Sequence, residues 1–345
     1  MISVFNGAHM TRGSLRRGGM RVGAKEVPCW WAMAATVRLP PAGASADAEG
    51  QGPVAMINII VKWYLAHART LPWRGDHVSA WAVLVSEVML QQTPVSRVKP
   101  VFIEWMARWP TPAALAAESP GEAVRAWGRL GYPRRALRLH AAASVCVAQH
   151  GGEVPDDVVK LRALPGVGDY TSAAVASFAY AQRHAVLDTN VRRVHARLFG
   201  ARQFERPGAP TKAERTRALE LLPLGGHDAA QASIAVMEFG ALICTARTPN
   251  CDTCPMSGAC GWLLAGRPPW SGPERKGQTY AGTDRQCRGR ILQAVRDAPA
   301  PVLRANVERV WDDHPQLVRA LTSLLHDELI EEVVTPHGRA YRLPQ

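Results

Sequence analysis

The sequence predicts an all-α protein with a cysteine-rich metal site, and three observations carry that prediction. Apolar residues recur at the three- and four-residue spacing of amphipathic helices, as Ile57, Ile60 and Tyr64 illustrate. The alternation of apolar and polar residues that marks a half-buried strand is almost absent before residue 325. Four of the seven cysteines are crowded into residues 244–260, which is typical of a metal site rather than a disulfide framework.

Helices are expected in succession along the body of the chain, and no internal repeat is evident. The first starts at Ile57 and ends before the segment LPWR, and Pro94 suits the first turn of a later one. The expected helices after the first lie over residues 81–93, 94–109, 112–117, 120–128, 133–149, 156–164, 171–180, 191–200, 212–222 and 228–244.

Composition divides the chain into four parts. Residues 1–55 lack an amphipathic period, which predicts a disordered extension, with a transit peptide as the alternative. Residues 56–263 form the helical core, and residues 264–284 predict a linker rich in proline, glycine and charge. Residues 285–345 predict three helices and a hairpin that turns at PHG. That outline is typical of a winged-helix module, and a small helical cap of no particular function is the alternative.

The chain is strongly basic. A formal net charge of +12 and a pI near 9.8 indicate an anionic partner such as nucleic acid, although solubility alone can explain a basic chain. No apolar run approaches the ~20 residues that a helix needs to cross a membrane. We therefore expect a soluble protein of the bacterial cytoplasm.

The four crowded cysteines, Cys244, Cys251, Cys254 and Cys260, follow the spacing C-x6-C-x2-C-x5-C. Four thiolates in a compact loop suit either a [4Fe–4S] cluster or zinc, but zinc ribbons use two separated C-x2-C pairs and this segment has one. The spacing resembles the cluster loop of the endonuclease III and MutY branch of the helix-hairpin-helix DNA glycosylases. That resemblance implies a structural [4Fe–4S] cluster that braces a loop against DNA.

The segment LPGVGDYTSAAV fits the hairpin of this family. Gly166 and Gly168 allow a tight turn whose exposed amides, beside a helix N-terminus, suit a DNA phosphate. Asp188 follows Gly168 by 20 residues, which matches the family's arrangement. Asp188 also precedes a helix, so it is a good N-cap, and we expect both roles. A helix N-terminus favours the ionised carboxylate, which stabilises the positive charge that develops on the sugar as a base leaves.

Glu87 lies among apolar residues of an expected helix. It is therefore either at the helix rim, paired with an arginine such as Arg74, or buried with a raised pKa that suits a general acid. The segment SEVMLQQT resembles the MutY segment whose glutamate protonates N7 of adenine, and this favours the buried acid.

Tyr170 discriminates between two branches of the family. Endonuclease III-like enzymes place at this position a lysine that forms a Schiff base with the sugar and then cleaves the strand. A phenol cannot form an imine, and no lysine lies between Lys160 and Lys212. The enzyme that the resemblance implies therefore removes a base and leaves an abasic site.

Three further segments, LPWR, QQT and LGYP, resemble the MutY parts that lie near the flipped base or enter the duplex. Pro133 replaces the second aromatic residue of the family's LGYY segment. Asn190 matches the asparagine beside the family's aspartate and, with Tyr170, is expected to organise the catalytic site. The implied DNA contacts are Trp73, Arg74, Gln92, Thr93, Leu130, Tyr132, Gly166 and Gly168.

The resemblance covers about residues 57–262 and implies a monomeric base-excision-repair enzyme. It would flip adenine opposite 8-oxoguanine or guanine out of double-stranded DNA and hydrolyse its bond to the sugar. The residues after the cysteine loop do not resemble the MutT-like domain of typical MutY proteins. We therefore expect Gln92, Thr93 and Leu130 to contribute more to recognition, with backbone contacts from the C-terminal module. The alternatives are a thymine or uracil mismatch glycosylase and a non-catalytic iron–sulfur DNA-binding regulator.

Overall fold

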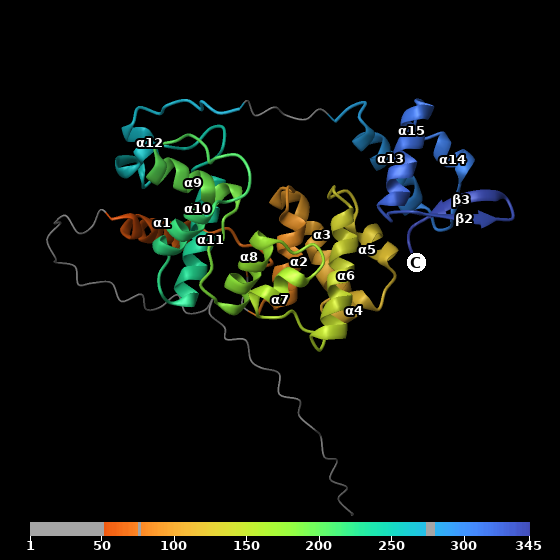
Figure 1. The fold of residues 1–345 in the computed structure, drawn as a ribbon, viewed down its shortest axis with the longest axis horizontal. Coiled ribbons are helices and arrows are strands. Elements are labelled where there is room, and N and C mark those ends of the chain that lie inside the picture. The colour runs from red at the N-terminus through yellow and green to blue at the C-terminus, as the bar shows by residue number, and fades with distance from the viewer. Residues whose placement is uncertain (1–51, 75–76, 274–279) are drawn as a thin grey trace, which may run out of the picture.

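The computed structural model describes residues 52–74, 77–273 and 280–345, whose path Figure 1 shows. Helices dominate, as the sequence predicted, and none of the described helices is long and apolar enough to span a membrane. The expected extension over 1–55 lies outside the described residues as far as Gln51, and the first helix begins at Pro53. The helices of the body are α1 Pro53–His67, α2 Ala80–Leu90, α3 Val95–Arg108, α4 Pro112–Ala116, α5 Pro120–Trp127, α6 Arg134–Gln149, α7 Val158–Ala163, α8 Asp169–Tyr180, α9 Thr189–Gly200, α10 Lys212–Leu221, α11 Gly226–Leu242 and α12 Gly261–Leu264.

The body contains two apolar cores. The first joins α2 to α8, and its tryptophans Trp105, Trp109 and Trp127 pack edge to face. The second joins α1 to α9–α12 around Ile60 and Phe239, so the chain starts in the second core, builds the first and then returns (Figure 1). Because α8 contacts both α2 and α11, it lies where the two cores meet.

A third unit follows the cysteine loop. Its elements are α13 Asp284–Asp297, β1 Val302–Leu303, α14 Arg304–Glu308, α15 His314–His326, β2 Glu331–Thr335 and β3 Gly338–Arg342. The strands form an antiparallel sheet in the order β1-β3-β2, with Val302 opposite Tyr341 and Val333 opposite Ala340. The three helices and the hairpin match the winged-helix outline. Strand β1 was not predicted, because two residues are too few to show an alternating pattern.

The C-terminal unit packs on the first core. Its apolar residues, including Cys287, Ile291, Leu324 and Tyr341, belong to the same apolar cluster as α2–α8. In Figure 1 the unit lies beside α5, at the end of the molecule away from α12. The cysteine loop thus lies by the second core, whereas the unit that follows it packs on the first.

One predicted helix boundary was wrong in a way that bears on function. Helix α2 ends at Leu90, whereas the sequence suggested Thr93. The chain turns at Gln92, which takes a left-handed backbone conformation with φ 55°, and the Thr93 amide donates to the Leu90 carbonyl at 3.2 Å. The last three residues of the expected helix therefore form a turn with Gln92 exposed at its tip.

Candidate active site

Glu87 lies on α2, a helix buried on nearly every side and capped by the side chain of Ser79. Only 7% of Glu87 is exposed, and its Oε2 accepts a 2.9 Å hydrogen bond from the Tyr170 hydroxyl of α8. Burial raises the pKa of the Glu87 carboxyl to about 7; Tyr170 and Arg74 oppose this rise, and Asp188 adds to it. The alternative of a rim glutamate paired with Arg74 is therefore wrong.

Asp188 follows the extended segment after α8 and caps α9, as expected. Its Oδ1 accepts a 2.7 Å bond from the Val191 amide, and its Oδ2 accepts one of 2.7 Å from Asn190 Nδ2. Burial raises the pKa of the Asp188 carboxyl, and these hydrogen bonds with the charge of Arg193 oppose the rise. Since both oxygens accept N–H donors, the geometry fits the ionised carboxylate.

A chain of hydrogen bonds joins Asp188 to the cysteine loop. Asn190, which donates to Asp188, accepts a 2.8 Å hydrogen bond at its Oδ1 from Arg193 Nη2. Arg193 in turn donates from its Nε to the Cys244 carbonyl at 2.8 Å. Arg197, one turn later and almost fully buried, donates to Cys244 Sγ at 3.3 Å. Sequence reasoning missed both arginines, although their spacing of four on one helix was a usable signal.

The hairpin between α7 and α8 contains both predicted glycines. Gly166 has φ 80°, and a Cβ there would lie 2.8 Å from Cβ of Arg138, so the position requires glycine. Gly168 caps α8 and has open space where a Cβ would stand. The first amides of α8 next to this open space suit a phosphate.

Arg74 contacts a second buried carboxylate, which sequence reasoning missed. Glu238 of α11 accepts from Arg74 Nη1 at 3.0 Å and from Arg69 Nε and Nη2 at 2.7 Å each. Burial acts to raise the pKa of Glu238, but Arg69 and Arg74 outweigh it and hold that pKa below its ordinary value. The sequence contained one signal of this buried carboxylate, because Glu238 is the acid inside the apolar run MEFGAL. Trp73, beside Arg74, is buried in the first core.

Two loops carry the residues that were predicted to enter the duplex. Gln92 and Tyr132 are exposed, and both have left-handed backbones, with φ 55° and 48°. Thr93 and Leu130 are buried instead, and the Thr93 hydroxyl donates to the Leu130 carbonyl at 3.2 Å. In the free protein, therefore, Thr93 and Leu130 join the two loops, and Gln92 and Tyr132 form their tips.

Arg135 ties the same two loops together and was also missed from the sequence. It donates to the Gln91 carbonyl at 2.5 Å, to the Gly131 carbonyl at 2.9 Å and to the Thr93 hydroxyl at 2.8 Å. Each carbonyl directly precedes a tip residue. A buried arginine with several backbone acceptors fixes backbone that would otherwise relax. Its place in LGYPRR, at a helix start, gave no sign of this burial.

The four cysteines lie between the end of α11 and the start of α12. Cys244 and Cys260 are buried, whereas Cys251 and Cys254 are partly exposed. Burial raises the pKa of Cys254 to about 11, and the other three cysteines also influence it. Among the described residues, no three His, Cys, Asp or Glu side chains gather as a single metal ion requires. Four cysteine thiolates are the ligand set that holds an iron–sulfur cluster.

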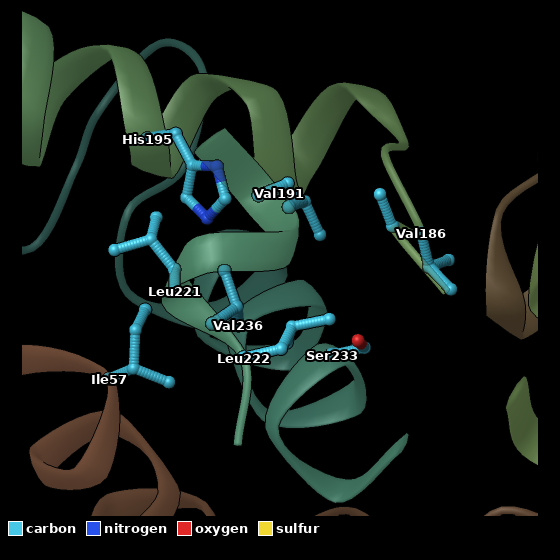
Figure 2. A pocket seen from close by; sticks show the side chains of 10 residues that line it. Ile57, Val186, Val191, His195, Leu221, Leu222, Ser233 and Val236 are labelled. Atoms are coloured by element: carbon cyan, nitrogen blue, oxygen red, sulfur yellow. The ribbon is translucent and has the colours of Figure 1, made fainter. Parts of the chain in front are cut away.

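A small cavity in the second core is not a substrate pocket. Figure 2 shows its lining, in which His195 of α9 faces Leu221 and Val236. About 10 Å³ of free volume admits at most one water molecule. Burial lowers the pKa of His195 to about 4, so the ring is neutral at pH 7 and serves the packing.

Comparison with known proteins first defines a class. Residues 85–223 match the HhH-GPD superfamily of base excision DNA repair proteins, and residues 244–260 match the iron–sulfur binding domain of endonuclease III. A solved thermostable thymine-DNA glycosylase is 28% identical, with a TM-score of 0.58 over 64% of this chain and 100% of that one. A non-covalent endonuclease III–DNA complex, 23% identical with a TM-score of 0.53 over 62% and 96% of the chains, supports the fold alone. Fold and site thus define a helix-hairpin-helix base-excision protein.

Curated relatives then narrow the class. The adenine DNA glycosylase of Mycobacterium tuberculosis is 51% identical over 277 residues, which span 80% of this chain and 90% of that one. The adenine DNA glycosylase of Mycolicibacterium smegmatis is 50% identical over 285 residues, or 81% and 93%. The chain belongs to the adenine DNA glycosylase family and is a DNA N-glycosylase with a [4Fe–4S] cluster as its cofactor.

Proposed function

We propose that this chain excises adenine opposite 8-oxoguanine or guanine from double-stranded DNA by hydrolysing the bond between the base and the deoxyribose. The observation that carries the proposal is the pair of carboxyls where the two cores meet. Glu87 has a pKa of about 7, and Asp188 is held by N–H donors at the start of α9. Relatives named adenine DNA glycosylases, at 50% and 51% identity, support adenine as the base.

Glu87 supplies the proton that the leaving base needs. At neutral pH a substantial fraction of Glu87 is protonated, and transfer of its proton to N7 of the flipped adenine makes the base a better leaving group. When the bond between base and sugar breaks, its electron pair leaves with the base and the sugar becomes an oxocarbenium ion. The Asp188 carboxylate stabilises that cation. Water then adds to the sugar carbon and returns a proton to Glu87.

Tyr170 limits the chemistry to hydrolysis. Its hydroxyl donates to Glu87, so it orients the acid, and a phenol cannot form the imine on which strand cleavage depends. The nearest lysines along the chain are Lys160 and Lys212, which lie outside the hairpin and α8. The product is therefore an abasic site in an uncut strand.

The DNA contacts follow from the exposed features of the first core. Gly166 and Gly168 shape the hairpin that receives a phosphate, and Gln92 and Tyr132 enter the duplex while the adenine is flipped. The four predicted cysteines hold the cluster, and the hydrogen bonds of Arg197 brace their loop. The enzyme acts as a monomer on the nucleoid.

The experiment is an excision assay with three duplexes. They hold adenine opposite 8-oxoguanine, thymine opposite guanine, and an oxidised pyrimidine, and each is incubated with and without alkali. We expect strand breaks from the first duplex alone, and only after alkali. Breaks without alkali would contradict hydrolysis, and release of thymine would favour the thymine glycosylase alternative. An adenine–guanine duplex tests the second mispair, and catalytically dead Glu87→Gln protein controls for contaminating nucleases.

A further inference from the structure

The C-terminal unit, residues 284–345, packs directly on the first core. Gly121 at the start of α5 donates its amide to the Pro344 carbonyl at 2.8 Å. A Cβ on Gly121 would stand 2.4 Å from that oxygen and 2.8 Å from Cβ of Leu343. Backbone therefore packs on backbone here, and the unit has one defined position on α5.

The C-terminal unit carries no net formal charge. Residues 284–345 contain nine arginines, no lysine and nine acidic residues, so their formal charge is zero. Residues 52–283 contain 26 basic and 17 acidic residues and therefore carry a positive formal charge. Arg319, on the exposed face of α15, pairs with Asp284 at 3.5 Å. DNA-binding domains present a basic surface, and this unit has no net positive charge.

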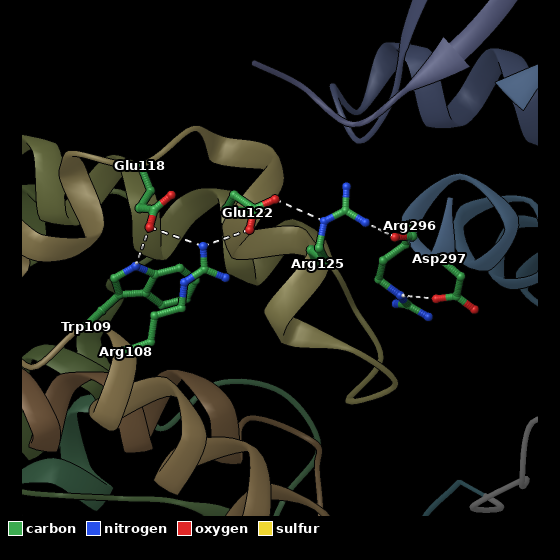
Figure 3. Close-up of polar contacts among 7 residues, drawn as sticks. All are labelled: Arg108, Trp109, Glu118, Glu122, Arg125, Arg296 and Asp297. Carbon is green, nitrogen blue, oxygen red and sulfur yellow. Dashed lines mark hydrogen bonds and ion pairs between the residues drawn. The ribbon is translucent and has the colours of Figure 1, made fainter. Parts of the chain in front are cut away.

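The unit instead contacts the loop that carries Tyr132. Figure 3 shows Arg125 of α5 lying between Glu122 and the backbone of Arg296 on α13. The Arg296 guanidinium, whose side chain is 10% exposed, donates to the carbonyl of Gly128, where the loop begins. The unit thereby holds the first residue of the loop.

The other end of the loop is anchored to the same unit. Arg134, the first residue of α6, pairs with Asp327 at 3.2 Å, and Arg288 of α13 holds Asp327 in place at 2.6 Å. Between the anchors, Gly128 and Tyr132 have left-handed backbones with φ 55° and 48°. A non-glycine residue in this conformation is strained and persists only where its surroundings fix it.

We propose that the C-terminal unit is a clamp that holds the loop 128–134 in the conformation that drives Tyr132 into the duplex, with Arg296 as its principal positioning residue. The unit thereby serves mispair separation without gripping DNA itself. It is an alternative to the expectation that the C-terminal module supplies backbone contacts to DNA. The inference rests on the proposed function in one respect, namely that Tyr132 inserts into the duplex as a wedge between the bases.

The test compares two arginines of the same helix in the full-length protein. Arg296→Met removes the contact with Gly128 and keeps an apolar stem, whereas Arg290→Met removes the same charge from an exposed site. Under single turnover with adenine opposite 8-oxoguanine, we expect Arg296→Met to slow excision about ten- to a hundredfold, because the wedge is misplaced. Arg290→Met should stay within about twofold. Equal losses would show that charge, and not positioning, is what the unit contributes.

A double variant separates the clamp from general destabilisation. If Arg296 acts through the wedge, Arg296→Met combined with Tyr132→Ala should be no slower than Tyr132→Ala alone. Multiplied losses would overturn the proposal. A 2-aminopurine placed beside the mispair becomes more fluorescent when the duplex is opened. We expect its fluorescence to rise less when Arg296→Met or Tyr132→Ala binds than when the wild type binds. A rise with Arg296→Met equal to that with the wild type would also contradict the proposal. If Tyr132→Ala itself excises normally, the wedge role in the proposed function fails, and the clamp fails with it.

A second anchor keeps the test usable if Arg296→Met does not fold. Asp327→Asn weakens the hold on Arg134 and leaves Arg296 in place. We expect a smaller loss of excision, about three- to tenfold, which again disappears when Tyr132 is alanine. A loss that persists in the Tyr132→Ala background would contradict the clamp.

Discussion

Glu87 and Glu238 are both buried glutamates, one from each apolar core, and they differ in the partners that reach their carboxyls. Glu238 meets two arginines and has a pKa below its ordinary value. Within the part of the chain that the structure describes, Glu87 has no arginine in contact, and burial raises its pKa to about 7 against the opposing hydrogen bond from Tyr170. Since both side chains are almost fully buried, the partners decide the protonation state. A glutamate between arginines anchors structure, whereas one without a cation in contact can act as an acid.

The largest expected effect is on catalysis, and it applies to Glu87 and its partner Asp188. Glu87→Gln removes the proton donor, and Asp188→Asn removes the charge that stabilises the sugar cation. Each should slow single-turnover excision of adenine by about a thousandfold or more. Binding of the mispaired duplex, followed by fluorescence anisotropy, should change little. Normal turnover by either variant would contradict its assigned role.

The next effect is on stability and applies to Glu238. Glu238→Gln leaves two arginines facing a neutral group, and breaking such a buried pair costs about 3–5 kcal/mol of unfolding free energy. Denaturant unfolding measures this directly. Glu104→Gln, an exposed change of the same charge on α3, is the matched control and should stay within about 0.5 kcal/mol of the wild type. Equal stabilities of the two variants would remove the structural role of Glu238.

Glu87→Gln should have the opposite effect on stability. Because the folded-state pKa of Glu87 is about 7, above its ordinary value of 4.5, the folded protein loses stability as pH rises from about 4.5 to about 7. Glutamine avoids that ionisation. Glu87→Gln should therefore be more stable than the wild type by up to about 3 kcal/mol at pH 8 and nearly equal to it near pH 4.5. A stability difference between the two proteins that is the same at both pH values would indicate that the wild-type pKa is not raised.

The smallest effect concerns Tyr170. Its hydrogen bond lowers the pKa of Glu87, so Tyr170→Phe should raise that pKa further. Excision depends on protonated Glu87 and falls above its pKa, so the alkaline limb of the pH–rate profile should move upward by about one unit or less. The measurement is the single-turnover rate between pH 6 and about pH 9. Movement of the limb toward lower pH would contradict the hydrogen bond's assigned direction.

The sequence was sufficient for local structure that residues close in the chain define. The hairpin glycines, Tyr170 and the cap at Asp188 each belong to a short motif, and the helical body follows from spacing. Glu238 and Arg135 were missed because their partners lie far away in sequence, Arg69 in one case and the loop after α2 in the other. In the sequence, such a long-range contact is visible only as an acid or an arginine whose position the local pattern does not explain.

The burial of the loop residues Thr93 and Leu130 could not be predicted from the sequence either. Thr93 and Leu130 lie in segments that the resemblance assigns to DNA contact, yet both side chains are buried, and the Thr93 hydroxyl donates to the Leu130 carbonyl. Whether a residue of a turn points out or in depends on backbone angles such as those of Gln92 and Tyr132. Those angles are fixed by tertiary contacts and leave no local pattern in the chain.

The most direct test of the comparison is a titration of the glutamate side-chain carboxyls by ¹³C NMR in the free enzyme, with Glu87→Gln and Glu238→Gln used to assign the two signals. We predict that the Glu87 signal titrates with a midpoint near pH 7, while the Glu238 signal shows an ionised carboxylate from about pH 5 upward. A Glu87 midpoint at or below about pH 5, indistinguishable from that of an exposed glutamate, would contradict the assignment of Glu87 as the acid.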